Sequence, residues 1–186
     1  MTDADREQLQ RLLLERSVRF GDFTLASGRR SSFYIDCRPT TMSAQGLTLI
    51  GRLGLQAIRG RSWRPSAVGG LTLGADPVAY AIAAASWGTD LVIDGFSVRK
   101  EAKEHGAGRL IEGNFAPGQP VVVIEDVITS GGSAQKAIDA VEAAGGSVLG
   151  VLAVVDRQEG GRAALEGRGR EVVALITSKQ LGVDRL

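Results

Sequence analysis

The chain has 186 residues, of which 44% are hydrophobic and 23% charged, a balance that excludes a disordered chain and fits one well-buried globular domain. Its 22 basic and 21 acidic residues leave a net charge of +1, so no overall field favours nucleic acid and any anion site must be a local arrangement. The single cysteine, Cys37, excludes an internal disulfide and a cysteine-rich metal cluster, and we expect it to be a small buried hydrophobic residue.

The N-terminal segment MTDADREQLQRLLLER is acidic and then amphipathic, which is unlike a secretory leader. No other stretch approaches the roughly 20 apolar residues that are needed to span a bilayer. We therefore expect a cytoplasmic protein without a membrane segment or a nucleic-acid partner. Its length favours a single domain covering residues 1–186.

The first 60 residues predict a helix, a β element and a second helix. The first helix is indicated by apolar residues at helical spacing, namely Leu9, Leu12, Leu13 and Val18. The segment 23–36, FTLASGRRSSFYID, favours two short extended runs separated by a Ser-Gly turn. Ser43 is suited to cap the second helix, and Gly60 to end it.

The rest of the chain alternates strands and helices. An AVGG strand end precedes a helix that we expect to begin with Asp76 as N-cap and Pro77 at the first helical position. LVIDGFSV and VVVIED read as strands on either side of a polar stretch, residues 99–113. A helix ending at Gly145, the strand VLGVLAVVD, a helical patch near Ala163 and the strand EVVALIT follow. This pattern predicts an α/β fold, a central parallel sheet flanked by helices, whose ligands bind at the carboxyl ends of the strands.

The run VVVIEDVITSGGSAQKAIDAV carries the most specific signal. Glu125 and Asp126 end a buried strand, and a loop rich in Thr, Ser and Gly then opens a helix. Glycines let the backbone approach an anion, Thr129, Ser130 and Ser133 offer hydroxyl donors, and the helix start offers N–H groups. No Lys follows the last glycine, and the spacing is not that of a dinucleotide site. The loop is therefore predicted to hold a phosphate.

Two adjacent acids beside a phosphate site need a separate reason, because like charges repel. The vicinal hydroxyls of a ribose, with a magnesium ion nearby, satisfy that need. A ribose 5-phosphate therefore fits, with its phosphate in the loop and its hydroxyls on Glu125 and Asp126. The alternative is an ordinary helix N-terminus that follows two solvated acids.

This run resembles the ribose-phosphate-binding motif of type I phosphoribosyltransferases. The resemblance implies the fold of that family, 5-phosphoribosyl 1-diphosphate as the sugar donor, and Mg2+ held mainly through the substrate near the two acids, without direct protein ligands. The donor-binding residues that it implies here are Glu125, Asp126, Val127, Ile128, Thr129, Ser130, Gly131, Gly132 and Ser133. The motif identifies the donor and leaves the acceptor open.

Four further segments resemble the orotate phosphoribosyltransferases. FTLASGRRSSFYID resembles the segment that lies over orotate, with Phe33 and Tyr34 as candidates to face the ring; ordinary core aromatics are the alternative. With the first helix it would form an N-terminal hood, residues 1–40. GGLTLGADP resembles the loop that receives pyrophosphate through backbone N–H groups and Thr72. Many relatives have lysines where this chain has Ala26 and Leu73, so the resemblance departs there.

FSVRKEAKEHGAGRLIEG resembles the mobile catalytic lid of this family, here residues 99–113. Sugar transfer builds negative charge on the departing pyrophosphate, which cationic side chains stabilise while a closed lid excludes water. The lid residues that the resemblance assigns to donor binding are Arg99, Lys100, Lys103 and His105. It assigns catalysis to three of them, Arg99, Lys103 and His105, together with Asp126. A solvated charged loop is the alternative.

AVVDRQEG places Arg157 just past a strand end, where it resembles the arginine that holds orotate. A guanidinium can form two parallel hydrogen bonds to a carboxylate, and Thr129 can add a hydroxyl contact. In the family the lid of one subunit reaches the active site of its partner, so the resemblance implies a homodimer. The implied reaction converts orotate to orotidine 5'-monophosphate in pyrimidine biosynthesis. The alternatives are a phosphoribosyltransferase for another base and a non-catalytic nucleotide-sensing regulator on the same fold.

Overall fold

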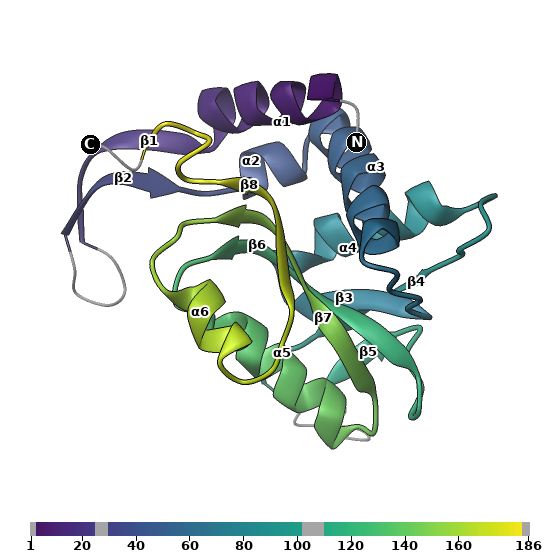
Figure 1. Ribbon diagram of the computed structural model, residues 1–186. Helices are drawn as coiled ribbons and strands as arrows, with labels where there is room; N and C mark the ends of the chain where they lie inside the picture. Colours follow the sequence, from purple (N-terminus) through teal and green to yellow (C-terminus); the bar gives the residue numbers. More distant parts are fainter. Residues whose placement is uncertain (1–2, 25–29, 102–109, 184–186) are drawn as a thin grey trace.

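The structure, a computed structural model, describes residues 3–24, 30–101 and 110–183. Within these ranges a six-stranded sheet has the order β5-β4-β3-β6-β7-β8 (Figure 1). Its parallel strands are β3 (Ala67–Leu71), β4 (Asp94–Val98), β6 (Pro120–Ile128), β7 (Ser147–Asp156) and β8 (Val172–Thr177). The short edge strand β5 (Ile111–Gly113) is antiparallel to β4. The expected parallel α/β sheet is thus confirmed.

Helices cover both faces of this sheet. The helices α3 (Ala44–Gly60) and α4 (Ala75–Ser86) lie on one face, and α5 (Gly132–Ala143) and α6 (Gly161–Glu166) lie on the other. In β6, Val122 and Ile124 are buried with the α3–α4 cluster, whereas Val121 and Val123 are buried with the α5 cluster. Successive side chains of a strand point to opposite faces, so a strand between two helix layers is apolar throughout.

The N-terminal part consists of α1 (Asp3–Arg16), the antiparallel strands β1 (Val18–Thr24) and β2 (Arg30–Ile35), and the short helix α2 (Arg38–Thr41). Figure 1 shows α1 and the hairpin at the top of the molecule, next to α2. The buried leucines of α1 pack into the α3–α4 cluster. The hydroxyls of Ser17 and Thr40 share a buried hydrogen bond of 2.7 Å, which ties the start of the hairpin to α2.

Several local expectations can be compared with these elements. Ser43 caps α3 as expected, its hydroxyl accepting from the Gly46 N–H at 3.0 Å, and Cys37 is fully buried. The placement of Val18 in the first helix was wrong, because this β-branched residue begins β1. Asp76 as N-cap was also wrong: α4 begins at Ala75, and the Asp76 carboxylate accepts a hydrogen bond from the Ser97 hydroxyl at 2.7 Å.

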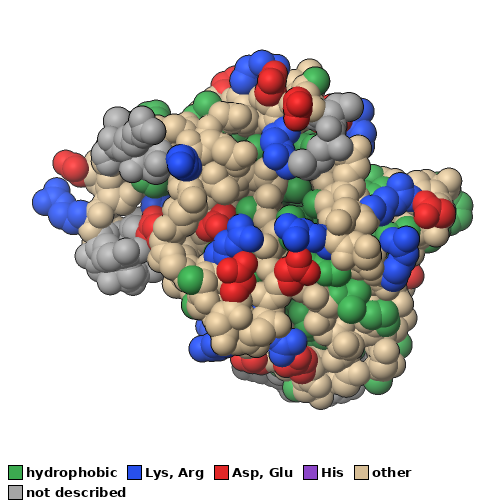
Figure 2. All heavy atoms as spheres, viewed as in Figure 1, with side chains coloured by type: hydrophobic (Ala, Val, Ile, Leu, Met, Phe, Trp, Pro, Cys, Tyr) green, Lys and Arg blue, Asp and Glu red, His purple; other side chains and the backbone are tan. Residues whose placement is uncertain are grey.

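Two elements, α2 and β5, had no counterpart in the sequence-based prediction. None of the helices in the described parts of the chain combines the length and the apolar character that a membrane span requires. On the face shown in Figure 2, basic and acidic side chains are interspersed, and many lie next to a side chain of opposite sign.

Candidate active site

A cavity of about 580 Å³ lies where the carboxyl ends of β3 and β6 meet the hairpin. One wall is the end of β6 with the loop that follows it. The other walls are the end of β2 with the start of α2, the loop after β3, Lys100 after β4, and Arg157 after β7. This is the edge at which parallel α/β sheets bind their ligands.

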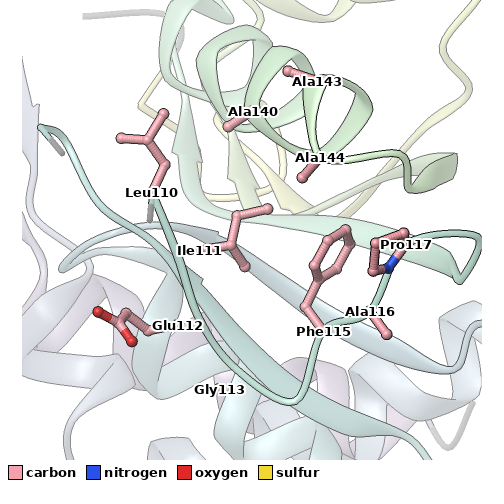
Figure 3. Close-up of a pocket in the computed structure, with 10 residues that line it drawn as sticks. All are labelled: Leu110, Ile111, Glu112, Gly113, Phe115, Ala116, Pro117, Ala140, Ala143 and Ala144. Carbon is pink, nitrogen blue, oxygen red and sulfur yellow. The ribbon is translucent and has the colours of Figure 1, made fainter. Parts of the chain in front are cut away.

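A second cavity, of about 600 Å³, lies between β5, the loop that follows β5, and the second half of α5 (Figure 3). Of the ten residues that line it, only Glu112 is ionisable, and most of the others are apolar. Transfer chemistry on a charged sugar requires convergent polar groups. We therefore place the candidate active site in the first cavity.

The acid pair forms the floor of this cavity. Glu125 is 6% exposed, and burial, with a further contribution from the charge of Asp126, raises its pKa to about 8. Burial also raises the pKa of Asp126, although the Val127 N–H opposes this by donating to Asp126 Oδ1 at 2.8 Å. At neutral pH Glu125 therefore retains a proton and can donate a hydrogen bond to a hydroxyl, which an ionised carboxylate cannot do.

The loop after the acids forms a small hollow of about 90 Å³ lined by Glu125 and residues 127–133. Gly131 has φ +80°, a backbone conformation that residues other than glycine rarely adopt. A Cβ at this position would lie 3.0 Å from the Gly161 carbonyl oxygen. The glycine therefore permits both the turn and the close approach of α6. The hollow has the size and the polar lining that suit one phosphate group.

The loop after β3 lies against the acid pair. Its Thr72 N–H donates to the Val98 carbonyl at 2.9 Å, and the Thr72–Leu73 peptide bond is cis. A Cβ added at Gly74 would lie 2.6 Å from Asp126 Oδ1, so only a glycine leaves this carboxylate in place. Leu73, one of the two departures from the family pattern, is 64% exposed and lines the cavity.

Arg157 reaches the cavity from the end of β7. The parallel register pairs Ile128 with Asp156, so Arg157 follows directly beside Thr129. Its side chain is 3% exposed and contacts Glu159 Oε1 at 2.7 Å. The guanidinium carbon lies 4.7 Å from the centroid of the Phe33 ring, within the range of a cation–π contact. Packing of the hairpin thus holds Arg157 in one orientation.

Phe33 and Tyr34 point to opposite sides of β2, as neighbours on a strand must. Tyr34 lines the cavity, is 40% exposed, and has its ring 5.7 Å from that of Phe23. Phe33 packs against the main core and beneath Arg157. Of the two aromatic residues, Tyr34 therefore lines the cavity, and Phe33 packs against the arginine.

Sequence reasoning missed Asp36 and Arg38, which line the cavity just after β2. Arg38 Nε and Nη2 donate to the two carboxylate oxygens of Asp36 at 2.8 and 2.9 Å. This contact lowers the pKa of Asp36 and raises that of Arg38. The available signal was an acid and a base, two residues apart, directly after a strand that was itself expected near the ligand.

The cavity brings together ten of the residues that the sequence nominated: Tyr34, Thr72, Lys100, Glu125, Asp126, Val127, Thr129, Ser130, Ser133 and Arg157. The smaller hollow adds Ile128, Gly131 and Gly132. Arg99 lines neither the cavity nor the hollow. Its side-chain Nε lies 3.1 Å from Glu112 Oε1, and its backbone N–H donates to the Leu110 carbonyl at 2.8 Å. Lys103, His105 and Ala26 lie outside the described residues.

No family model matches the chain. It is 44% identical over 184 residues to the orotate phosphoribosyltransferase of Rhodopirellula baltica, an alignment that covers 97% of this chain and 95% of that protein. The crystal structure of Mycobacterium tuberculosis H37Rv orotate phosphoribosyltransferase with Fe(III) dicitrate matches with a TM-score of 0.84 and 45% identity, covering 96% of this chain and 99% of that one. The same enzyme in complex with 5-phospho-alpha-D-ribosyl 1-diphosphate matches with a TM-score of 0.80 and 41% identity, at the same coverage of both chains.

Proposed function

We infer the reaction of this chain from its family, because it belongs to the orotate phosphoribosyltransferases. It transfers ribose 5-phosphate from 5-phosphoribosyl 1-diphosphate to orotate, and so makes orotidine 5'-monophosphate and pyrophosphate for pyrimidine biosynthesis. The observation that carries this conclusion is a single cavity that joins an anion-binding loop, an acid pair and a buried arginine. Those three features match the 5-phosphate of the donor, its ribose hydroxyls and the carboxylate of orotate.

We propose that the donor lies along the floor of the cavity. Its 5-phosphate would occupy the hollow of residues 127–133, where backbone N–H groups and hydroxyls can donate. The ribose hydroxyls would lie on Glu125 and Asp126, and Glu125, whose pKa is raised to about 8, can donate to one of them at neutral pH. The diphosphate would then extend toward the loop of Thr72 and toward Lys100, which line the same cavity.

The acid pair also fits a role near magnesium. Carboxylate oxygen is a donor type that Mg2+ prefers, and Asp126 presents one at the cavity wall beside the proposed ribose. We propose that the ion is held mainly by substrate oxygens, with Asp126 and Glu125 near it. When bound, it would offset the negative charge of the diphosphate.

For orotate we propose a position between Arg157, Thr129 and Tyr34. A guanidinium has five N–H donors, so Arg157 can hold Glu159 and still bind the orotate carboxylate. Because Arg157 and Glu159 are paired, the site carries little net charge before the substrate arrives. The hydroxyl of Thr129 would add a contact to the edge of the pyrimidine ring.

We propose that residues 99–113 act as a lid on a single-domain, cytoplasmic enzyme, with Lys103, Arg99 and His105 offsetting the charge of the departing pyrophosphate. Sharing of this lid between subunits would require a homodimer. Exposed apolar side chains on and beside α4 supply a candidate interface: Leu73, Tyr80, Trp87 and Val92. Lone exposed hydrophobic residues are common, but a group along one helix favours a protein contact.

The direct test is turnover with a panel of bases. Purified protein is mixed with magnesium, 5-phosphoribosyl 1-diphosphate and either orotate, uracil, adenine or hypoxanthine, and loss of each base is followed. We expect consumption of orotate with release of pyrophosphate. Consumption of another base in its place would contradict the orotate assignment, and donor binding without turnover of any base would favour the regulator.

A further inference from the structure

Arg38 is a cation on the cavity wall to which the proposed reaction gives no role so far. It lies in the first turn of α2, preceding Pro39, and lines the cavity but not the phosphate hollow. Its side chain is 52% exposed, whereas that of its partner Asp36 is 26% exposed. The pair therefore lies at the rim, with the arginine the more accessible of the two.

The position of Arg38 is fixed by three hydrogen bonds to one carboxylate. Nε and Nη2 donate to Asp36 Oδ1 and Oδ2 at 2.8 and 2.9 Å, and the backbone N–H of Arg38 donates to Oδ1 at 3.0 Å. A guanidinium held by two parallel hydrogen bonds loses little further entropy when it binds a ligand. Two of its five N–H donors are used in this way, so three can donate to an anion.

The neighbours of Arg38 in the cavity are Asp126 and the loop after β3, toward which we place the diphosphate. Burial raises the pKa of Asp126, and the charge of Arg38 is among the influences that oppose this rise. Asp126 in turn lies against Gly74 in the loop after β3. Arg38, Asp126 and Gly74 all line the cavity, and none of the three lines the phosphate hollow.

We propose that Arg38, held by Asp36, binds the diphosphate of the sugar donor and then the pyrophosphate product; this rests on the proposed function. In the transfer, the bond from the anomeric carbon of the ribose to the diphosphate oxygen breaks, and its electron pair leaves with pyrophosphate. Arg38 meets this growing charge without moving a proton, because a guanidinium stays protonated. The other cations that line the described cavity are Lys100, which we place near the same diphosphate, and Arg157, which is paired with Glu159 and assigned to the base.

The alternative is that Asp36 and Arg38 only stabilise the turn between β2 and α2, since two contacting residues two positions apart can stabilise a turn by themselves. The two roles predict different results. A pair that only stabilises the turn affects folding stability and all substrates alike. A diphosphate-binding arginine affects pyrophosphate and the donor, and leaves ribose 5-phosphate nearly unchanged.

The test is calorimetric binding of three probes to the full chain with magnesium: pyrophosphate, ribose 5-phosphate and orotate. Arg38→Ala should weaken pyrophosphate binding by about 10- to 100-fold, the range for one charge-assisted contact. Ribose 5-phosphate binding should change by less than about 3-fold, within the spread of ordinary surface substitutions. Arg38→Lys should fall between, because lysine keeps the charge and loses the planar fork.

Arg52→Ala is the matched control. Arg52 pairs with Asp5 at 3.2 Å with side-chain exposures of 53% and 21%, close to those of Arg38 and Asp36, but it does not line the cavity. This variant should bind all three probes as the unmodified protein does. Equal pyrophosphate binding by the Arg38→Ala and Arg52→Ala variants would overturn the proposal, and so would a loss confined to orotate or shared by all probes.

Arg38→Gln keeps most of the side-chain length, and serves if the alanine variant folds poorly. Steady-state kinetics add a second readout, because loss of a diphosphate contact should raise the KM for the donor and leave the KM for orotate unchanged. Pyrophosphate binding is measured without any base. The unmodified protein can thus fail to use orotate while Arg38 still governs pyrophosphate, which separates failure of the proposed function from failure of this inference.

Discussion

Two walls of the cavity are built in different ways: the β6 wall, which is the end of β6 with its loop, and the hairpin wall, which is the end of β2 with the start of α2. The β6 wall is part of the buried sheet: Glu125 is 6% exposed, and the strand that carries it is apolar on both faces. The hairpin wall carries Tyr34 and Arg38, whose side chains are about half exposed and lie outside the main sheet. Burial on the β6 wall thus raises the pKa of its two acids, whereas the hairpin wall presents the accessible positive charge of Arg38.

This difference assigns separate tasks to the walls. Burial raises the pKa of both neighbouring carboxyl groups, that of Glu125 to about 8, and a protonated carboxyl group suits recognition of neutral hydroxyls. The guanidinium of Arg38 stays protonated and is accessible, so it suits a strongly anionic group. Arg157 lies where the walls meet, since it follows β7 and packs under Phe33 of the hairpin. Substitutions on each side should therefore affect different substrates.

The largest effect is expected at Asp126, on the β6 wall. Asp126→Asn keeps the size of the side chain and an oxygen that can accept from the Val127 N–H, but removes the charge beside the ribose. We expect kcat/KM for the donor to fall by about 100-fold or more, the scale of losing one transition-state charge contact. The melting temperature should hold or rise, because asparagine lacks the ionisable group whose pKa burial raises. A variant that lost stability and kept its activity would mark Asp126 as structural.

Arg157 tests the junction of the walls. Arg157→Ala should lower kcat/KM for orotate by about 50-fold, because truncation of a buried charge partner costs 2 kcal/mol or more. Binding of ribose 5-phosphate should change little, since the phosphate hollow does not include this residue. The control is Arg162→Ala, which breaks an exposed pair with Glu166 at 2.8 Å. Equal kinetics of the two variants would remove Arg157 from the orotate site.

Gly74 tests the contact between the loop after β3 and the β6 wall. The backbone of Gly74, with φ −61° and ψ −43°, suits alanine, so the only conflict of Gly74→Ala is the new Cβ 2.6 Å from Asp126 Oδ1. Displacement of this carboxylate should lower kcat/KM for the donor by about 10-fold, because small misplacements of reacting groups are costly. Gly60→Ala is the control, as a Cβ there meets nothing within 4 Å. An unaffected Gly74→Ala enzyme would show that the exact place of Asp126 is unimportant.

The sequence allowed the β6 wall to be predicted and the hairpin wall only in part. The acid pair and its loop are contiguous, and a parallel sheet brings every strand's carboxyl end to one edge, so Arg157 could be placed beside Thr129. Arg38 lies close to Asp126 only because the hairpin packs over the sheet, and no local pattern encodes a contact between segments 88 residues apart (126 less 38). The three-residue β5 was too short for a periodic signal.

A further effect is expected on stability, and it concerns burial of the β6 wall. The pKa of Glu125 rises from its ordinary value of 4.5 to about 8 in the folded chain. Between these values the native state holds a proton that the unfolded chain has released, so stability is present at low pH and is lost as the pH rises toward 8. The free energy of unfolding should fall by up to about 1.4 kcal/mol per pH unit in that window.

Glu125→Gln removes the titrating group and keeps its shape, so it should flatten this fall in urea unfolding experiments at pH 5, 6, 7 and 8. Glu166→Gln, a substitution on the exposed helix α6, should keep the profile of the unmodified chain. Equal slopes for all three proteins would mean that Glu125 is ionised in the folded state at neutral pH. The β6 wall would then hold two negative charges, and its distinction from the hairpin wall would rest on position alone and not on protonation.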